Sequence, residues 1–140
     1  MKIIAEHLGI ASQNSAALRD WYIATLGAKL VFDNGQTPPS CLIAIGGAFM
    51  IEIYPATSKL GETSNNLLAG WRHLALQVES IEEAKAELEK KGVTFADPIK
   101  PAVGGGRVLF FRDPENNLLH FAERPKGSSL RHQGACARNI

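Results

Sequence analysis

The chain has 140 residues, of which 45% are apolar and 21% are charged, as is typical of one globular domain. The 15 Lys and Arg residues nearly balance the 14 Asp and Glu residues, so the net charge of +1 provides no basic surface for nucleic acid or an anionic membrane. Only two cysteines, no long apolar run and no secretory leader pattern are present, and we therefore expect a cytoplasmic protein without a disulfide framework.

The first half of the chain predicts one helix among several strands. A strand opens at His7, where bulky apolar residues alternate with small or polar ones. The helix begins near Asn14 or Ser15 and ends before Gly27, which can adopt the positive φ that suits a helix end. The other strands expected in this half cover residues 28–32 and 50–54.

The second half repeats this order. A strand opens at His73, Ser80-Ile81-Glu82-Glu83 forms a capping box for a second helix, and Gly92 ends that helix. A β-rich run at 93–95 and a hydrophobic strand at 118–122 complete the copy. Because these landmarks recur at nearly the same spacing, we interpret the chain as a duplicated β-α-β-β-β unit, whose copies are joined by a polar linker.

Two segments lie outside this repeat. Gly104-Gly105-Gly106 lacks the lysine and the following helix of a phosphate-binding loop, so we expect a mobile loop over a cleft. Residues 125–140 are polar and aperiodic, which predicts a tail that frays or lies on a partner and in which His132 is solvated.

The alternation along each strand predicts the role of its two faces. In the first strand Leu8 and Ile10 point to one side, while His7, Gly9 and Ala11 point to the other. The first strand of the second copy repeats this pattern. We expect the bulky face to pack on the helices and the small, polar face to leave room for a ligand.

Four polar residues occupy matching places in otherwise apolar strands: His7 and Glu52 in the first copy, His73 and His120 in the second. Burying such groups costs free energy unless they are paired, neutral or bound to a metal. Three imidazoles and one carboxylate suit a divalent ion such as Zn²⁺, Ni²⁺, Co²⁺, Mn²⁺ or Fe²⁺. Glu123 competes with His120, but it falls on the opposite strand face, and we expect it to end the strand at the solvent.

The sequence resembles the vicinal oxygen chelate superfamily, which includes glyoxalase I, methylmalonyl-CoA epimerase, extradiol dioxygenases and bleomycin- and fosfomycin-resistance proteins. The resemblance covers residues 3–124. It rests on the His7 strand, Trp21-Tyr22 with Leu26-Gly27, Ile51-Glu52-Ile53, Arg72-His73-Leu74-Ala75, and Phe-Arg-Asp-Pro-Glu-Asn-Asn at 111–117. The last run is similar to the family's Asp-Pro-Asp-Gly-Asn turn, which leads into the strand of the fourth metal ligand.

This resemblance implies an α+β fold in which two tandem βαβββ modules form a cupped eight-stranded mixed sheet around a metal. It implies one glyoxalase-like domain, residues 1–124, followed by the polar tail 125–140. The two repeats within that domain are expected at about 3–56 and 70–124.

The family's metal-ligand positions match His7, Glu52, His73 and His120. Position 120 departs from the family's pattern, because glyoxalase I, the epimerase and the dioxygenases usually have glutamate there. In glyoxalase-like enzymes such a glutamate also transfers protons. The histidine therefore leaves Glu52 as the only carboxylate among the expected ligands.

The leading hypothesis is a metal-dependent lyase or isomerase that acts beside a carbonyl of a small oxygen-chelating substrate. The metal would stabilise an enediolate, Glu52 would move the proton, and His120 would be a second acid or base. No organic cofactor is expected. The resemblance also implies a homodimer, with each site either within one chain or shared between two.

Three alternatives stay open. A protein of the bleomycin-resistance kind would bind a small molecule without catalysis, although such members usually lack the metal ligands. An Fe(II) extradiol-type dioxygenase would use two histidines and one glutamate, and it would have a second domain. A transferase acting on an epoxide such as fosfomycin would need basic residues, but Arg19, Arg72 and Arg107 are interpreted as surface residues.

Overall fold

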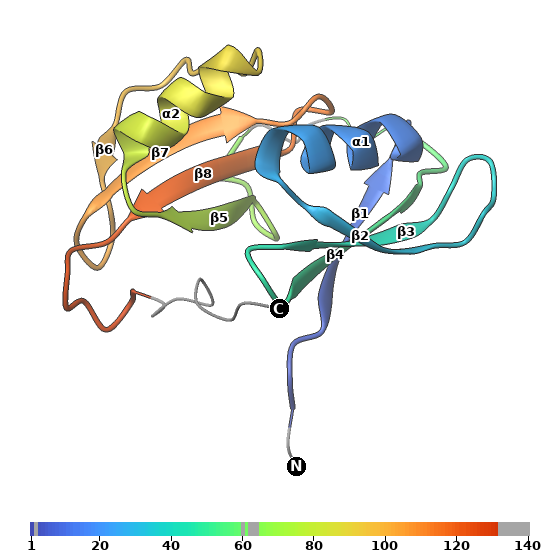
Figure 1. Cartoon of the computed structure of the whole chain (residues 1–140), viewed down its shortest axis with the longest axis horizontal. Helices are drawn as coiled ribbons and strands as arrows, with labels where there is room; N and C mark the ends of the chain where they lie inside the picture. The colour runs from blue at the N-terminus through green and yellow to red at the C-terminus, as the bar shows by residue number, and fades with distance from the viewer. Residues whose placement is uncertain (2, 60, 62–64, 132–140) are drawn as a thin grey trace. The chain divides into compact units, whose positions relative to one another are not determined.

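The computed structural model of the chain describes residues 1, 3–59, 61 and 65–131 (Figure 1). The chain divides into two compact units, residues 1–60 and 61–140. The elements of the first unit are β1 (His7–Ser12), α1 (Ser15–Leu26), β2 (Lys29–Asp33), β3 (Cys41–Ile45) and β4 (Phe49–Pro55). The elements of the second are β5 (His73–Val78), α2 (Ile81–Lys90), β6 (Lys100–Pro101), β7 (Arg107–Arg112) and β8 (Leu118–Glu123).

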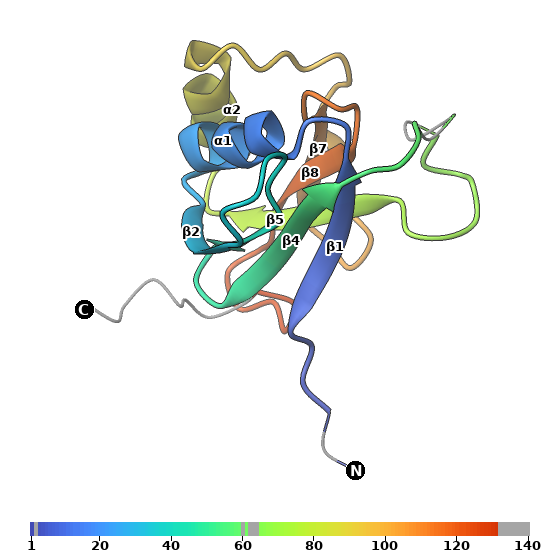
Figure 2. The same ribbon diagram turned by 90° about the vertical axis from the view of Figure 1, so that its right-hand side faces the viewer.

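Each unit contains one four-stranded mixed sheet, and the two sheets have the same topology. The strand orders are β1-β4-β3-β2 and β5-β8-β7-β6. In each sheet the first two strands of this order run parallel, and the other pairs are antiparallel. Figure 2 shows the parallel strands β1 and β4 side by side. The predicted fold class, two tandem βαβββ modules, is confirmed. The eight strands that were expected in one sheet form two sheets of four.

The helices begin and end where the sequence predicts. The side chain of Asn14 caps α1 by accepting a hydrogen bond from the Ala17 amide (3.1 Å), and Gly27 ends the helix in the left-handed region (φ 68°). The side chain of Ser80 caps α2 by accepting from the Glu83 amide (3.2 Å). In each unit the helix packs on its own sheet, α1 on β1, β3 and β4, and α2 on β7 and β8.

The core of each unit lies between its helix and its sheet. In the first unit, side chains of α1, β3 and β4 are almost fully buried: Leu18, Tyr22, Ile43, Ile51 and Ile53. In the second, the corresponding side chains come from α2, β7 and β8: Ile81, Leu88, Leu109, Phe111, Leu119 and Phe121. Burial of these apolar surfaces holds each helix on its sheet and fixes the register of the strands.

The β-rich run at 93–95 is not a strand, and this part of the prediction was wrong. The strand that follows α2 is β6, which has only two residues, Lys100 and Pro101. Phe95 instead packs its ring against Phe111 and Phe121, with centroids 5.7 and 6.5 Å apart. The apolar character of this run therefore serves side-chain packing, without backbone pairing in a ladder.

The glycine-rich segment forms a hydrogen-bonded turn between β6 and β7. Its mobility and its position over a cleft stay predictions. The guanidinium of Arg124 donates hydrogen bonds to the carbonyl oxygens of Val103 and Gly105, both at 2.7 Å. At Gly106 (φ 86°) a Cβ atom would lie 2.0 Å from the carbonyl oxygen of Glu123. Glycine is thus required at this position because β8 ends against the turn.

None of the helices in the described part of the chain is both long and apolar enough to cross a membrane. The predictions for His132 and for most of the tail fall at 132–140, outside the described residues.

Candidate functional site

The open strand faces match the predicted alternation. On β1 the residues His7, Gly9 and Ala11 are exposed, while Leu8 and Ile10 between them are partly buried. On β5 His73 and Ala75 are exposed in the same way. The sheets therefore present small and imidazole-bearing faces, as their sequences indicate.

In the first unit, His7 and Glu52 lie next to each other across the parallel strands β1 and β4. Glu52 is registered opposite Gly9, two residues beyond His7. The distance from His7 Nε2 to Glu52 Oε2 is 3.5 Å, and both side chains are accessible, at 35% and 41% exposure. The strand register alone brings this pair together, because residues two apart share a face.

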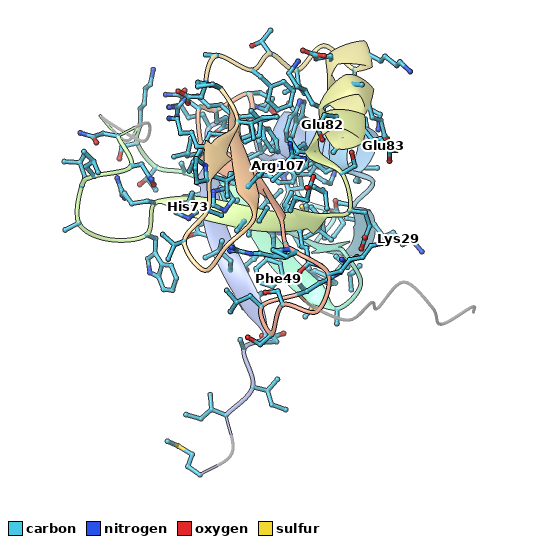
Figure 3. The ribbon with its side chains drawn as sticks, turned by 90° about the vertical axis from the view of Figure 1, so that its left-hand side faces the viewer. Lys29, Phe49, His73, Glu82, Glu83 and Arg107 are labelled. Atoms are coloured by element: carbon cyan, nitrogen blue, oxygen red, sulfur yellow. The ribbon has the colours of Figure 1, made fainter. Side chains whose placement is uncertain are left out.

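The second unit brings His73 and His120 together in the same register. His120 is opposite Ala75, two residues beyond His73, as Glu52 is beyond His7 in the first unit. The two imidazole rings lie with their centroids 4.6 Å apart and their planes tilted by 38°. The four residues that occupy matching positions in the two sequence copies therefore occupy equivalent register positions on the two sheets. Figure 3 labels His73 at the start of β5.

His120 differs from the other three residues because it is buried, with 9% of its surface exposed. The ring of Phe110 packs edge-on against it, at 4.7 Å between centroids. Its Nδ1 atom has no hydrogen-bond partner among the described residues. Burial, aided by the nearby His73 and Arg124, lowers the pKa of His120 to about 4. The imidazole is therefore neutral at pH 7, the form that can ligate a metal.

In each of the two exposed histidines, the Nδ1 atom of the ring contacts a side-chain oxygen. Glu6 Oε2 lies 2.8 Å from His7 Nδ1, and Asn66 Oδ1 lies 2.8 Å from His73 Nδ1. Neither Glu6 nor Asn66 was identified from the sequence. Glu6 directly precedes the strand and so interrupts no alternating pattern, and Asn66 is one of several polar residues in the linker. Neither position therefore stands out in the sequence.

Glu123 is separate from this site, as strand parity predicts, but it does not simply face the solvent. Its carboxylate accepts a hydrogen bond from the Ile81 amide at 2.9 Å and pairs with Arg107 at 2.8 Å. Arg107 also donates a hydrogen bond to Glu82 at the start of α2; Figure 3 labels both residues. The Ile81 amide and then Arg107 lower the pKa of Glu123. This cluster joins α2 to the end of β8.

Two of the arginines left out of the site are engaged in ion pairs. Arg19 contacts Asp20 and Asp33, and Arg107 belongs to the cluster at the start of α2. Arg72 is partly buried, and its Nε atom has no partner within the described part of the chain.

Within each pair of candidate ligands, the donor atoms suit a transition-metal ion. Two ligands that share one ion at about 2.1 Å lie roughly 3.0–3.4 Å apart, close to the 3.5 Å between His7 and Glu52. The second pair supplies two imidazoles, one of them with a buried nitrogen that lacks a partner. Within the described ranges, no group of three or more His, Cys, Asp or Glu side chains is arranged to hold a metal ion.

Comparison with known proteins identifies a protein family whose model matches most of the chain. A family model described as the Glyoxalase/Bleomycin resistance protein/Dioxygenase superfamily matches residues 4–121. The uncharacterized protein YwkD of Bacillus subtilis (strain 168) is 25% identical over 122 residues, which span 84% of this chain and 94% of YwkD.

Two solved structures extend the comparison. A glyoxalase family protein from Enterococcus faecalis superposes with a TM-score of 0.73 at 27% identity, covering 86% of this chain and 97% of that one. The fosfomycin resistance protein FosX from Listeria monocytogenes, in complex with Mn(II) and sulfate, superposes with a TM-score of 0.69. At 19% identity, over 90% of this chain and 94% of FosX, the second likeness is one of fold.

Proposed function

The chain belongs to the Glyoxalase/Bleomycin resistance protein/Dioxygenase superfamily, and we propose that it is a metal-dependent lyase or isomerase. Its substrate is a small molecule with two neighbouring oxygen atoms. The observation that carries this proposal is the repeated pair of donor side chains, which occupy the same diagonal of the parallel strand pair in each unit.

We propose His7, Glu52, His73 and His120 as the ligands of one divalent ion, with Zn²⁺, Ni²⁺, Co²⁺, Mn²⁺ and Fe²⁺ as candidates. Three nitrogen donors and one oxygen donor suit these ions better than calcium or magnesium. The Mn(II) in FosX supports this choice by analogy of fold. When bound, such an ion supplies a Lewis acid that polarises two adjacent substrate oxygens.

Glu52 is the residue that moves the proton. It is the only carboxylate among the four residues, and its exposed side chain can reach a substrate over the open strand face. A carboxylate placed beside a carbon next to a carbonyl can take its proton and return it to a neighbouring atom, which is the isomerase reaction. Ala75, which lies opposite His120, leaves space for a compact substrate in the second unit. In the first unit the ring of Tyr54 lies over Gly9, 3.3 Å from where a Cβ would stand, so Gly9 makes room for this ring beside Glu52.

His120 has a supporting role in this proposal. With its pKa lowered to about 4, the imidazole stays neutral and keeps a nitrogen lone pair at physiological pH. It can therefore act as a ligand or accept a proton from a substrate hydroxyl. The rings of Phe110 and His73 both pack against it.

The proposal is tested by the metal content of protein purified without a histidine tag or chelator. Elemental analysis should find about one transition-metal ion per chain, lost in His7→Ala and in His73→Ala. His132→Ala removes a histidine that belongs to neither pair and serves as the matched control. A wild type that stays metal-free after incubation with Zn²⁺, Ni²⁺, Mn²⁺ or Fe²⁺ would overturn the enzymatic proposal.

A non-enzymatic binding protein is the second candidate, favoured by the exposed, small-residue faces of β1 and β5, which can receive a ligand without a metal. The family also includes bleomycin resistance proteins, and FosX is a resistance protein of the same fold. This candidate predicts that the metal-free wild type binds its small molecule with unchanged affinity.

We further propose a cytoplasmic homodimer. Cys41, the free cysteine within the described residues, is buried, and its thiol suits a reducing compartment. Light scattering coupled to gel filtration would give the mass of the assembly, and a monomer over the whole concentration range would contradict the dimer.

A further inference from the structure

The two exposed histidines have the same environment at the same ring atom. In the first unit Glu6 Oε2 lies 2.8 Å from His7 Nδ1, and in the second Asn66 Oδ1 lies 2.8 Å from His73 Nδ1. The two oxygens come from different places: Glu6 directly precedes β1, whereas Asn66 lies seven residues before His73, outside the strands. The internal duplication therefore does not account for the common arrangement.

The chemistry of these oxygens determines which ring nitrogen carries the proton. A carboxylate oxygen and an amide oxygen can only accept hydrogen bonds. At 2.8 Å each contact is a hydrogen bond, so Nδ1 must be the donor in both histidines. In a neutral imidazole with its proton on Nδ1, the lone pair belongs to Nε2.

The second ring nitrogen of His7 faces Glu52, the other candidate ligand of the first unit. His7 Nε2 lies 3.5 Å from Glu52 Oε2, on the side of the ring opposite the contact with Glu6. His120 has no such oxygen partner at Nδ1 and is held by the rings of His73 and Phe110. The arrangement thus separates two histidines oriented by hydrogen bonds from one oriented by packing.

We propose that Glu6 and Asn66 are positioning residues that fix His7 and His73 in the tautomer with the proton on Nδ1, so that Nε2 is ready to bind a metal. The role towards a metal rests on the function proposed above, whereas the tautomers do not depend on it. An oxygen that holds the second nitrogen of a ligating histidine orients the ring and increases its basicity.

The tautomers can be measured directly in the metal-free protein. Nitrogen-15 NMR at about pH 8.5, above the ordinary range of histidine titration, distinguishes a protonated Nδ1 from a protonated Nε2. His7→Ala and His73→Ala identify the two resonance sets. The variants compared are Glu6→Ala with Glu6→Gln, and Asn66→Ala with Asn66→Asp, since Gln and Asp retain an accepting oxygen.

We expect wild-type His7 and His73 to carry the proton on Nδ1. Glu6→Ala should move the proton of His7 to Nε2, and Asn66→Ala should do the same for His73, each without affecting the other histidine. The conservative variants should keep the wild-type tautomer. The affinity for Mn²⁺ or Zn²⁺, measured by competition with a chelator, should fall about 10- to 100-fold in the alanine variants and recover in the conservative ones.

Two results would distinguish a failure of the positioning role from a failure of the proposed metal function. If the alanine variants keep the wild-type tautomers, the positioning role is overturned, whatever metal the protein binds. If the tautomers change as expected but the wild type binds neither metal, the positioning of the imidazoles is supported and the proposed metal function is overturned. Because Glu6 and Asn66 are exposed, their substitution should leave the fold intact. The spectra of the same samples check this.

Discussion

Among the four candidate ligands, His120 has the most demanding environment. The other two described histidines keep both an exposed surface and an oxygen partner, but His120 is buried with an unpaired nitrogen. A buried polar group without a partner costs roughly 1–3 kcal/mol. The fold retains this group against its own stability, which is typical of residues that serve function.

The buried His120 predicts a loss of stability in acid. Its pKa is about 4 in the folded protein, against an ordinary value near 6.5, so the unfolded chain takes up a proton first as the pH falls. The contribution of the neutral imidazole to stability is full above about pH 6.5 and is lost as the pH falls to about 4, by up to roughly 2 kcal/mol. Urea unfolding of metal-free wild type and His120→Leu at several pH values should show a steeper decline for the wild type. Parallel curves would contradict this assignment.

Glu52 carries the proposed proton transfer, and Glu52→Gln tests it. The amide keeps the shape and a ligating oxygen but cannot accept the proton, so exchange should fall at least about 100-fold. The measurement is deuterium uptake from D₂O into small α-hydroxycarbonyl compounds, followed by NMR. Glu87→Gln, at an exposed position of α2, is the control. Unchanged exchange with full metal content would exclude Glu52 as the base.

The site residues could be predicted to different extents. His7, Glu52, His73 and His120 stand out in the sequence because each interrupts an apolar strand at a duplicated position, and the structure brings them together in two pairs. Whether they bind a metal stays a prediction. Glu6 and Asn66 could not be found in this way, because a side-chain contact from a turn or a strand end leaves no periodic pattern.

At the scale of single elements, α2 depends on a residue far away in the chain. Ser80 caps the helix locally, as the capping box predicts, but the Ile81 amide is bound by Glu123, 42 residues later. Local sequence could not reveal this contact, since the sheet brings the end of β8 to the start of the helix. The run at 93–95 illustrates the same limit, because its aromatic residue packs where a strand was expected.

Glu123→Ala should destabilise the second unit by about 1–2 kcal/mol, because the Ile81 amide and Arg107 both lose a partly buried partner. Glu87→Ala, which removes an exposed ion pair with Lys91, should change stability by less than about 0.5 kcal/mol. Urea unfolding of both variants at pH 7 provides the comparison. An equal effect of the two substitutions would show that the cluster at the start of α2 does not stabilise the fold.

The glycine turn allows a matched pair of substitutions. Gly105 and Gly106 both have positive φ, near 88° and 86°, so alanine is strained at either position, by about 1–2 kcal/mol. Only at Gly106 would the new Cβ collide with the backbone, 2.0 Å from the Glu123 oxygen. Gly106→Ala should therefore cost at least about 2 kcal/mol more than Gly105→Ala in thermal or urea unfolding. Similar losses would refute the close approach of β8.

For the whole molecule, the duplication is the organising feature. Both sheets have the same strand order, and both candidate pairs sit in the same register. This level of the fold could be predicted well, because strand alternation, helix ends and turn glycines recur in both halves. The second copy was predicted less accurately, since β6 has shrunk to two residues and no longer follows the pattern of the first.

The proposed metal site predicts linkage between binding and folding. An ion that binds only the folded chain stabilises it by about 2.7 kcal/mol at a free concentration of 100 times Kd. Mn²⁺ or Zn²⁺ should therefore raise the Tm of the wild type and leave that of His7→Ala and His73→Ala unchanged. An equal rise in all three proteins would point to binding elsewhere.

The junction at the end of β8 bears on how mutational surveys of this protein should be interpreted. Glu123 supports α2 and Arg107 there, its carbonyl oxygen excludes any side chain at Gly106, and Arg124 holds the neighbouring turn. A survey scored only by lost activity would rank these positions beside His120, although their contacts support the fold. Measuring protein abundance together with activity would separate the two groups: variants at the junction would disappear from the cell, whereas those at Glu52 would accumulate as inactive protein.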